Sequence, residues 1–451
     1  MPASPATPSP LRTLLSLRPG EAPLVLWSMA YFFLLLTSYY VLRPLREAMG
    51  LTGGVRELPR LFLATLACML VASLLFSAVA SRFPRRVFIP ITYGFFTLNL
   101  LVFFALFRAR AGADDVWIAR TFYVWVSVFN LFAVSVFWSF MVEIFDLEHG
   151  KRLFGLIGVG GTAGAILGSS TTAFFAERVG GVNLLPVSAV LLIGATACML
   201  QLNRAAGRRA TPAPAATRAD DADAPVSGGV FAGIVDLVRS PFLLGIALYV
   251  FLYTVTATIT YFMQGEIVAA AVPDRDARAS LFAIIDVTTN VLTVVIQVFL
   301  TGRIIRFLGV GLTLAVLPLV TVGGLLALGW LPTVLVLIVF QSCRRASNYA
   351  LAKPARESLF TILSREEKYK AKNFMDTFVY RSGDVAGSVL FETLRRQGAA
   401  AALGLPVLAA LTVPVGIVWI TVSILLGRHQ TRRARAAADP PDATLASGRP
   451  S

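Results

Sequence analysis

Long apolar stretches, each close to the length needed to cross a bilayer, recur along the whole chain and are separated by short polar segments. An apolar helix of about 20 residues spans the hydrocarbon core. On that basis the hydrophobic pattern predicts twelve membrane helices, at Leu24–Leu42, Leu58–Ala80, Val87–Phe107, Val116–Ile144, Leu153–Ala176, Leu184–Leu202, Pro241–Gln264, Leu281–Thr301, Val310–Gly329, Leu331–Ile362, Phe374–Leu394 and Pro406–Leu426. We therefore expect an all-α membrane protein.

Polar segments divide this pattern into two groups of six helices. We expect a disordered tail at 1–20, an N-terminal half at 21–203, a cytoplasmic linker at 204–240, a C-terminal half at 241–427 and a basic, disordered tail at 428–451. The halves repeat at an offset of about 220 residues. In this repeat Arg82–Arg86 matches Arg303–Arg306, and the glycine-rich run Gly160–Gly164 matches Tyr380–Asp384. Two parallel six-helix halves indicate a transporter of the major facilitator type, with the solute path between the halves.

Composition agrees with this picture. The chain has 451 residues, of which 56% are hydrophobic and 14% are charged, and its net charge is +15. The basic residues gather in the loops on one side of the predicted membrane, which predicts that both termini are cytoplasmic. We expect the protein to lie in the inner membrane. The positive charge therefore reflects topology, and we expect no nucleic-acid partner. We expect the lipid bilayer as the setting and a monomer as the assembly.

Catalytic and metal-binding motifs are missing from the sequence. The three cysteines stand alone in apolar runs, and there are only two histidines, so a metal site or a bound cofactor is not expected. The glycines of the fifth predicted helix, at 155, 158, 160, 161, 164 and 168, recur at helical spacing and predict close helix packing. The sequence thus indicates a transporter and not an enzyme.

The segment from Val334 to Ile362 begins as an apolar helix and then carries several cations. A cation facing lipid costs about 2.5–3.5 kcal/mol, so such a cluster should face water or paired groups. With α-helical spacing, one face would hold Arg345, Tyr349, Ala352 and Arg356, and Pro354 should disturb the helix. The alternative is a helix that ends at Phe340 and is followed by a basic loop. The first interpretation predicts a cavity wall that binds an anion through Arg344, Arg345, Asn348, Tyr349, Lys353 and Arg356.

Charges at other helix ends leave two interpretations open. Arg43 and Arg46, next to Tyr40, either cap the first helix at the interface or bind the anion. Glu143 either lines the cavity or pairs with Lys151 or Arg152.

The acidic residues of the C-terminal half are equally ambiguous. Asp286 is either one member of an ion pair or a proton-coupling carboxylate. Asp376, Arg381 and Asp384 form either a gating ion-pair network or part of the substrate site.

Three segments resemble the ATP:ADP antiporter (nucleotide transporter) family and its bacterial relatives. They are 42–47, with the sequence Leu-Arg-Pro-Leu-Arg-Glu; 137–155, from Phe-Trp to Leu-Phe-Gly; and 353–383, from Lys-Pro-Ala-Arg-Glu to Arg-Ser-Gly. The resemblance implies transport of a nucleotide-like anion. It places Arg46, Glu143 and Asp286 on positions of functional importance. Nucleotide exchangers carry lysine after Arg-Ser-Gly, whereas this chain has Asp384.

We therefore expect a secondary active transporter that moves an organic anion, such as a nucleotide or phosphorylated metabolite, by alternating access. The alternative is a proton-coupled carrier or exporter of a small metabolite or drug, which would use Asp286, Asp376 or Asp384.

Overall fold

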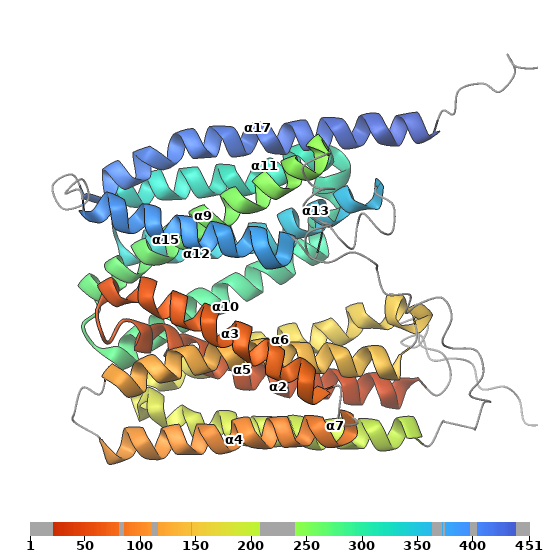
Figure 1. The fold of residues 1–451 in the computed structure, drawn as a ribbon, viewed down its shortest axis with the longest axis vertical. Coiled ribbons are helices and arrows are strands. Elements are labelled where there is room, and N and C mark those ends of the chain that lie inside the picture. The colour runs from red at the N-terminus through yellow and green to blue at the C-terminus, as the bar shows by residue number, and fades with distance from the viewer. Residues whose placement is uncertain are drawn as a thin grey trace, which may run out of the picture. The chain divides into compact units, whose positions relative to one another are not determined.

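The computed structural model describes residues 21–80, 85–110, 116–145, 147–207, 240–362, 372, 375–396 and 404–438. The chain divides into two compact units (Figure 1). The first comprises Met1–Ala216 with Val268–Asn290, and the second comprises Thr217–Ile267 with Val291–Ser451. The predicted N-terminal tail and the centre of the linker lie outside the described residues. The last helix continues to Ala438, into the predicted C-terminal tail, and the domain boundaries stay a prediction.

The first unit is built around helix α2 (Ala22–Gly50), which packs against α5 (Val116–Ile144), α6 (Leu147–Val179) and α7 (Leu185–Gly207). Helix α4 (Arg85–Ala109) contacts α5 and α7, and α3 (Leu58–Ala80) contacts α5. The first part of α10 (Arg275–Phe299) also belongs here, and Ser280 Oγ donates a hydrogen bond to the Ala173 carbonyl of α6 at 3.0 Å.

The second unit contains most of α9 (Pro241–Ala271), the end of α10, α11 (Thr301–Trp330), α12 (Val334–Ser347), the π-helical turn η3 (Asn348–Ala352), α13 (Lys353–Leu359), α15 (Tyr380–Arg396) and α17 (Gly404–Ala438). Helix α11 packs against α17, α12, η3 and α13. Short turns complete the elements: η1 (Val55–Glu57) and η2 (Gly181–Leu184) in the first unit, with η4 (Phe360–Ile362) and η5 (Met375–Val379) in the second.

Glycines allow helices to approach closely in both units. In the first, a methyl group on Gly160, Gly164 or Gly168 of α6 would overlap a backbone carbonyl of α2. In the second, a methyl group on Gly383 or Gly387 of α15 would overlap atoms of α9. The packing role predicted for glycine is thus confirmed at these α6 positions and at Gly161, where the added methyl would overlap a phenylalanine ring of α2. It is wrong for Gly155 and Gly158, because no described atom lies within 4 Å of a methyl group there.

Nine helices of the described chain are long and apolar enough to cross a membrane: α2, α4, α5, α6, α7, α9, α10, α11 and α17. The predicted total of twelve is therefore not confirmed. The tenth predicted span is helical but broken into α12, η3 and α13, and the eleventh coincides with η5 and α15. These segments carry too many charged residues in short helices to qualify by composition alone.

Candidate functional site

The segment from Val334 to Ile362 is helical throughout, so the alternative of a basic loop after Phe340 is wrong. Pro354 occupies the first turn of α13, directly after the π-helical turn. A proline at this position cannot donate a backbone hydrogen bond to the carbonyl four residues earlier, which is that of Ala350. Thr301 Oγ1 donates to that carbonyl instead, at 2.8 Å, and Gln297 Nε2 donates to the Tyr349 carbonyl at 3.3 Å. Two side chains of the second unit therefore donate to the carbonyls that lack a helical hydrogen-bond donor at this break in the helix, where the π-helical turn meets Pro354.

The break also changes which side chains share a face. The predicted common face of Arg345, Tyr349, Ala352 and Arg356 assumed α-helical spacing, but residues 348–352 form a π turn. Tyr349 is exposed, whereas Ala352 is buried and Arg345 and Arg356 are half-buried. The prediction of one continuous face is wrong for this reason.

Arg344 is the most buried of the predicted cations, with 6% of its surface exposed. Its Nε donates a hydrogen bond to Gln341 Oε1 at 3.3 Å. The Gln341 amide nitrogen in turn donates to Gln264 Oε1 of α9, so the orientation of this amide is fixed by its neighbour. Within the described residues, Arg344 makes no ion pair with a carboxylate, and the two Nη groups have no hydrogen-bond partner. Burying such a cation costs several kcal/mol unless an anion compensates it.

Two tyrosines link Asn348, which lies one turn after Arg344, to Arg356 through side-chain contacts. Asn348 Nδ2 lies 3.0 Å from the Tyr253 hydroxyl, and the Tyr253 and Tyr380 rings meet edge to face with centroids 6.1 Å apart. The Tyr380 hydroxyl accepts a hydrogen bond from Arg356 Nη1 at 2.9 Å, and the guanidinium carbon lies 5.7 Å from the ring centroid. We call Arg344, Asn348, Arg356, Tyr253 and Tyr380 the second-unit cluster.

The remaining predicted residues of this unit are Arg381, Asp384, Lys353 and Asp376. Arg381 pairs with Asp384, with 3.2 Å between Nη1 and Oδ2, as the ion-pair interpretation predicted. Thr258 of α9 also donates to Asp384, at 3.3 Å. Lys353 is exposed, and the side chain of Asp376 lies outside the described part of the structure.

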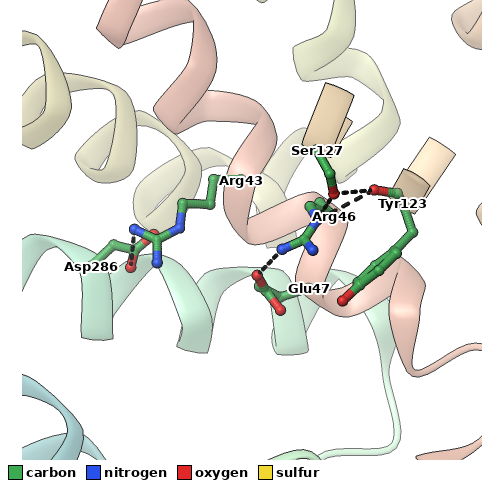
Figure 2. Close-up of polar contacts among 6 residues, drawn as sticks. All are labelled: Arg43, Arg46, Glu47, Tyr123, Ser127 and Asp286. Carbon is green, nitrogen blue, oxygen red and sulfur yellow. Dashed lines mark hydrogen bonds and ion pairs between the residues drawn. The ribbon is translucent and has the colours of Figure 1, made fainter. Parts of the chain in front are cut away.

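The first unit holds a second cluster, formed by Arg43, Arg46, Glu47 and Asp286 with Tyr123 and Ser127 of α5 (Figure 2). Arg43 Nη1 lies 3.2 Å from Asp286 Oδ1 and its guanidinium carbon lies 5.5 Å from the Tyr40 ring centroid. Asp286 is only 3% exposed, so the ion-pair interpretation describes its geometry correctly. We call this set the first-unit cluster.

Arg46 is held from several sides. Its Nη1 lies 2.6 Å from Glu47 Oε1, and its Nε donates to Ser127 Oγ at 2.9 Å and to the Tyr123 carbonyl at 3.3 Å. The guanidinium carbon lies 4.0 Å from the Tyr123 ring centroid, which is within cation–π range. Glu143 is not part of this cluster: it is exposed and lies sixteen residues after Ser127 on α5, about 24 Å along the helix axis. The side chains of Lys151 and Arg152, its predicted partners, lie outside the described part.

Sequence reasoning did not select Tyr253, Tyr380, Gln341, Gln264, Tyr123, Ser127 or Glu47 as site residues. Polar side chains inside apolar helices were the available signal for Gln264 and Gln341, because an amide in a membrane helix needs a partner. Nothing in the spacing alone distinguishes Tyr253 from the other tyrosines of the chain.

Comparison with known proteins places this geometry in context. No family model matches the chain. It is 25% identical over 348 residues to ADP,ATP carrier protein 1 of Chlamydia muridarum and of Chlamydia trachomatis, a match that covers 69% of this chain. The match spans 65% of the length of each of these carriers. The predicted resemblance to ATP:ADP antiporters is confirmed.

Solved structures show the fold. The nucleoside transporter NupG superposes with a TM-score of 0.59 at 10% identity, covering 91% of this chain and 99% of that protein. The POT-family transporter PepTSo gives a TM-score of 0.57 at 14% identity, covering 92% and 98%. The chain is a multi-pass membrane protein that shares its fold with these two transporters.

Proposed function

We propose that this protein is a secondary active transporter that moves a nucleotide-like organic anion across the inner membrane by alternating access. The observation that carries the proposal is Arg344, a buried guanidinium with unused Nη donors and no carboxylate partner among the described residues. A substrate phosphate or carboxylate can accept two parallel hydrogen bonds from such a group and supply the missing negative charge.

The second-unit cluster also offers groups for the rest of a nucleotide-like molecule. Arg356 provides a second cation, and its position is held by the Tyr380 hydroxyl. Tyr253 and Tyr380 present aromatic rings beside these cations, and a flat base can stack on such rings. The relatives named as ADP,ATP carriers support this substrate class. We propose that Arg345, Tyr349, Lys353 and Arg381 contribute further contacts as the substrate moves.

We further propose coupling or gating roles for Asp286 and Asp384, because each carboxylate is paired with an arginine and can exchange partners during transport. Glu143 and Asp376 are proposed for the same roles from the sequence alone. Asp384 reduces the net positive charge of its surroundings, so we expect a substrate with fewer charges than ATP. We propose cytoplasmic termini, following the distribution of basic residues. We also propose that the protein is a monomer.

The direct test is uptake of labelled nucleotides and sugar phosphates by vesicles containing the purified protein. We expect anion uptake that accelerates when the same anion is loaded inside, as exchange or a gradient must supply the energy. Absence of flux for every anion, together with proton-driven flux of a neutral or cationic compound, would contradict the proposal. That result would favour the proton-coupled carrier or exporter.

A further inference from the structure

A large apolar groove lies on the first unit and shares no lining residue with either cluster. Its volume is about 990 Å³, and its walls come from α3, α4 and α5. This volume is at the upper end of the roughly 300–1,000 Å³ range typical of small-molecule pockets. Six of the eighteen lining residues are aromatic, among them Phe88, Phe95, Phe96, Trp125 and Phe132. Helices α4 and α5 are long and apolar enough to cross a membrane, so the part of the groove between them lies at the depth of the hydrocarbon region.

The groove is elongated along the helices. On α3 its lining residues run from Arg60 near the start of the helix to Ala72, with Glu57 just before the helix. The fifteen steps from Glu57 to Ala72 correspond to about 22 Å at the rise of an α-helix. One leaflet contributes about half of the roughly 30 Å hydrocarbon core. The groove can therefore accommodate an acyl chain along a whole leaflet while its end reaches the polar interface.

Among the described lining residues, charged side chains occur at one end of the groove only. Glu57 pairs with two arginines: its Oε1 lies 2.9 Å from Arg60 Nη1, and its Oε2 lies 3.2 Å from Arg120 Nη2. One carboxylate between two guanidinium groups leaves one positive charge in excess. Trp117 lies beside them, with its ring centroid 5.2 Å from the Arg120 guanidinium carbon, and tryptophan is enriched at membrane interfaces.

Arg120 has a hydrogen-bond donor that its protein neighbours do not use. Its Nε is buried and has no partner among the described residues. A buried donor without an acceptor costs about 1–3 kcal/mol, so an acceptor from outside the chain would stabilise this arrangement. Arg60 is 80% exposed and can also turn toward a ligand at this end.

We propose that this groove binds an anionic glycerophospholipid, with its phosphate at Arg60 and Arg120 and one acyl chain along the aromatic wall. Charge complementarity selects an anionic headgroup over a zwitterionic one, because only the former leaves a net negative charge to pair with the excess positive charge. The apolar length selects a lipid over a free phosphate.

The test is native mass spectrometry of the full-length protein in detergent, titrated with phosphatidylglycerol or with phosphatidylcholine of identical acyl chains. We expect at least one phosphatidylglycerol to bind several-fold more tightly than phosphatidylcholine. Arg60→Gln should reduce this preference, and Arg60→Gln combined with Arg120→Gln should remove it. Glu57→Gln should increase the preference, since it raises the positive charge at the headgroup end.

Two further variants separate headgroup from acyl-chain recognition. Ala64→Phe fills the exposed groove wall and should weaken binding of both lipids. Arg306→Gln removes an exposed arginine of the second unit and should change neither. Equal binding of the two lipids to the unaltered protein, or an unchanged preference in both Arg60→Gln and Glu57→Gln, would overturn the proposal. Competition by glycerol phosphate, which has no acyl chain, would also overturn it. None of these readouts depends on the identity of the transported substrate.

Discussion

The two arginine clusters compensate their charge in opposite ways. In the first-unit cluster, Arg43 pairs with Asp286 and Arg46 pairs with Glu47, so two cations meet two carboxylates. In the second-unit cluster, Arg344 is held by the neutral amide of Gln341. Both arrangements satisfy a guanidinium with hydrogen bonds, but only the first also neutralises it.

This difference separates two uses of arginine in a membrane protein. A buried ion pair fixes the position of helices, and breaking it leaves an uncompensated charge. An amide fixes the orientation of the guanidinium without cancelling its field, so an incoming anion still gains the full electrostatic interaction. We therefore propose that the substrate binds chiefly at the second-unit cluster, and that Arg43 and Arg46 mainly hold helices in position.

The largest effect should come from removing the Arg344 guanidinium, which has no carboxylate partner among the described residues. Arg344→Gln should reduce anion uptake by more than 100-fold, about 2.7 kcal/mol, because no other group replaces its bidentate contact. Uptake by reconstituted vesicles measures this. Arg303→Gln is the matched control, since Arg303 is exposed and, among the described residues, bonds only to the Phe299 carbonyl of the preceding turn. Normal uptake by Arg344→Gln would reverse the assignment of the two clusters.

In the first-unit cluster, stability should change more than binding. Asp286→Asn should lower the free energy of unfolding by about 2 kcal/mol, less than for a fully buried pair because Arg43 is 20% exposed. Thermal unfolding in detergent measures the loss. Adding Arg43→Gln should restore part of the stability, as both charges are then absent. A double variant that is less stable than Asp286→Asn by the full cost of Arg43→Gln would show that the pair is not coupled.

A smaller change tests how Arg356 is positioned. Tyr380→Phe removes the hydroxyl that accepts from Arg356 but keeps the ring. Hydrogen bonds to charged groups contribute about 1.5–3 kcal/mol, so we expect KM for the anion to rise about tenfold while folding is retained. Tyr249→Phe is the control, because the Tyr249 hydroxyl donates to the Leu314 carbonyl and not to an arginine. Equal KM values for both variants would argue against a role for Arg356.

The smallest effect concerns the break before Pro354. Thr301→Val removes the hydroxyl that satisfies the Ala350 carbonyl and should cost about 1 kcal/mol of stability. It should also reduce uptake a few-fold, since the π-helical turn sets the positions of Arg344 and Arg356. Thr321→Val, whose hydroxyl bonds within its own helix, serves as control. An effect no larger than that of the control would mean that the π-helical turn needs no cap from α11.

Much of the fold followed from local patterns. Apolar runs predicted the helices, and the glycine spacing at residues 160–168 predicted close helix packing, which the structure shows between α6 and α2. The tenth predicted helix was also recognised despite its cations. The π-helical turn was not predicted, because a proline is compatible with several kinds of helix distortion. Which distortion forms depends on the hydrogen bonds from Thr301 and Gln297, about fifty residues away in sequence.

The sequence by itself determined that this chain is a helical, multi-pass membrane protein and that arginines at residues 43–46 and 344–356 are unusual, since bilayer length and the cost of intramembrane charge are local constraints. Only the tertiary structure decided which arginines are neutralised. Arg43 finds Asp286 from a helix more than 240 residues later, whereas Arg344 finds an amide three residues away. Composition shows that acidic and basic residues are present. Which of them pair depends on distances that only the tertiary packing determines.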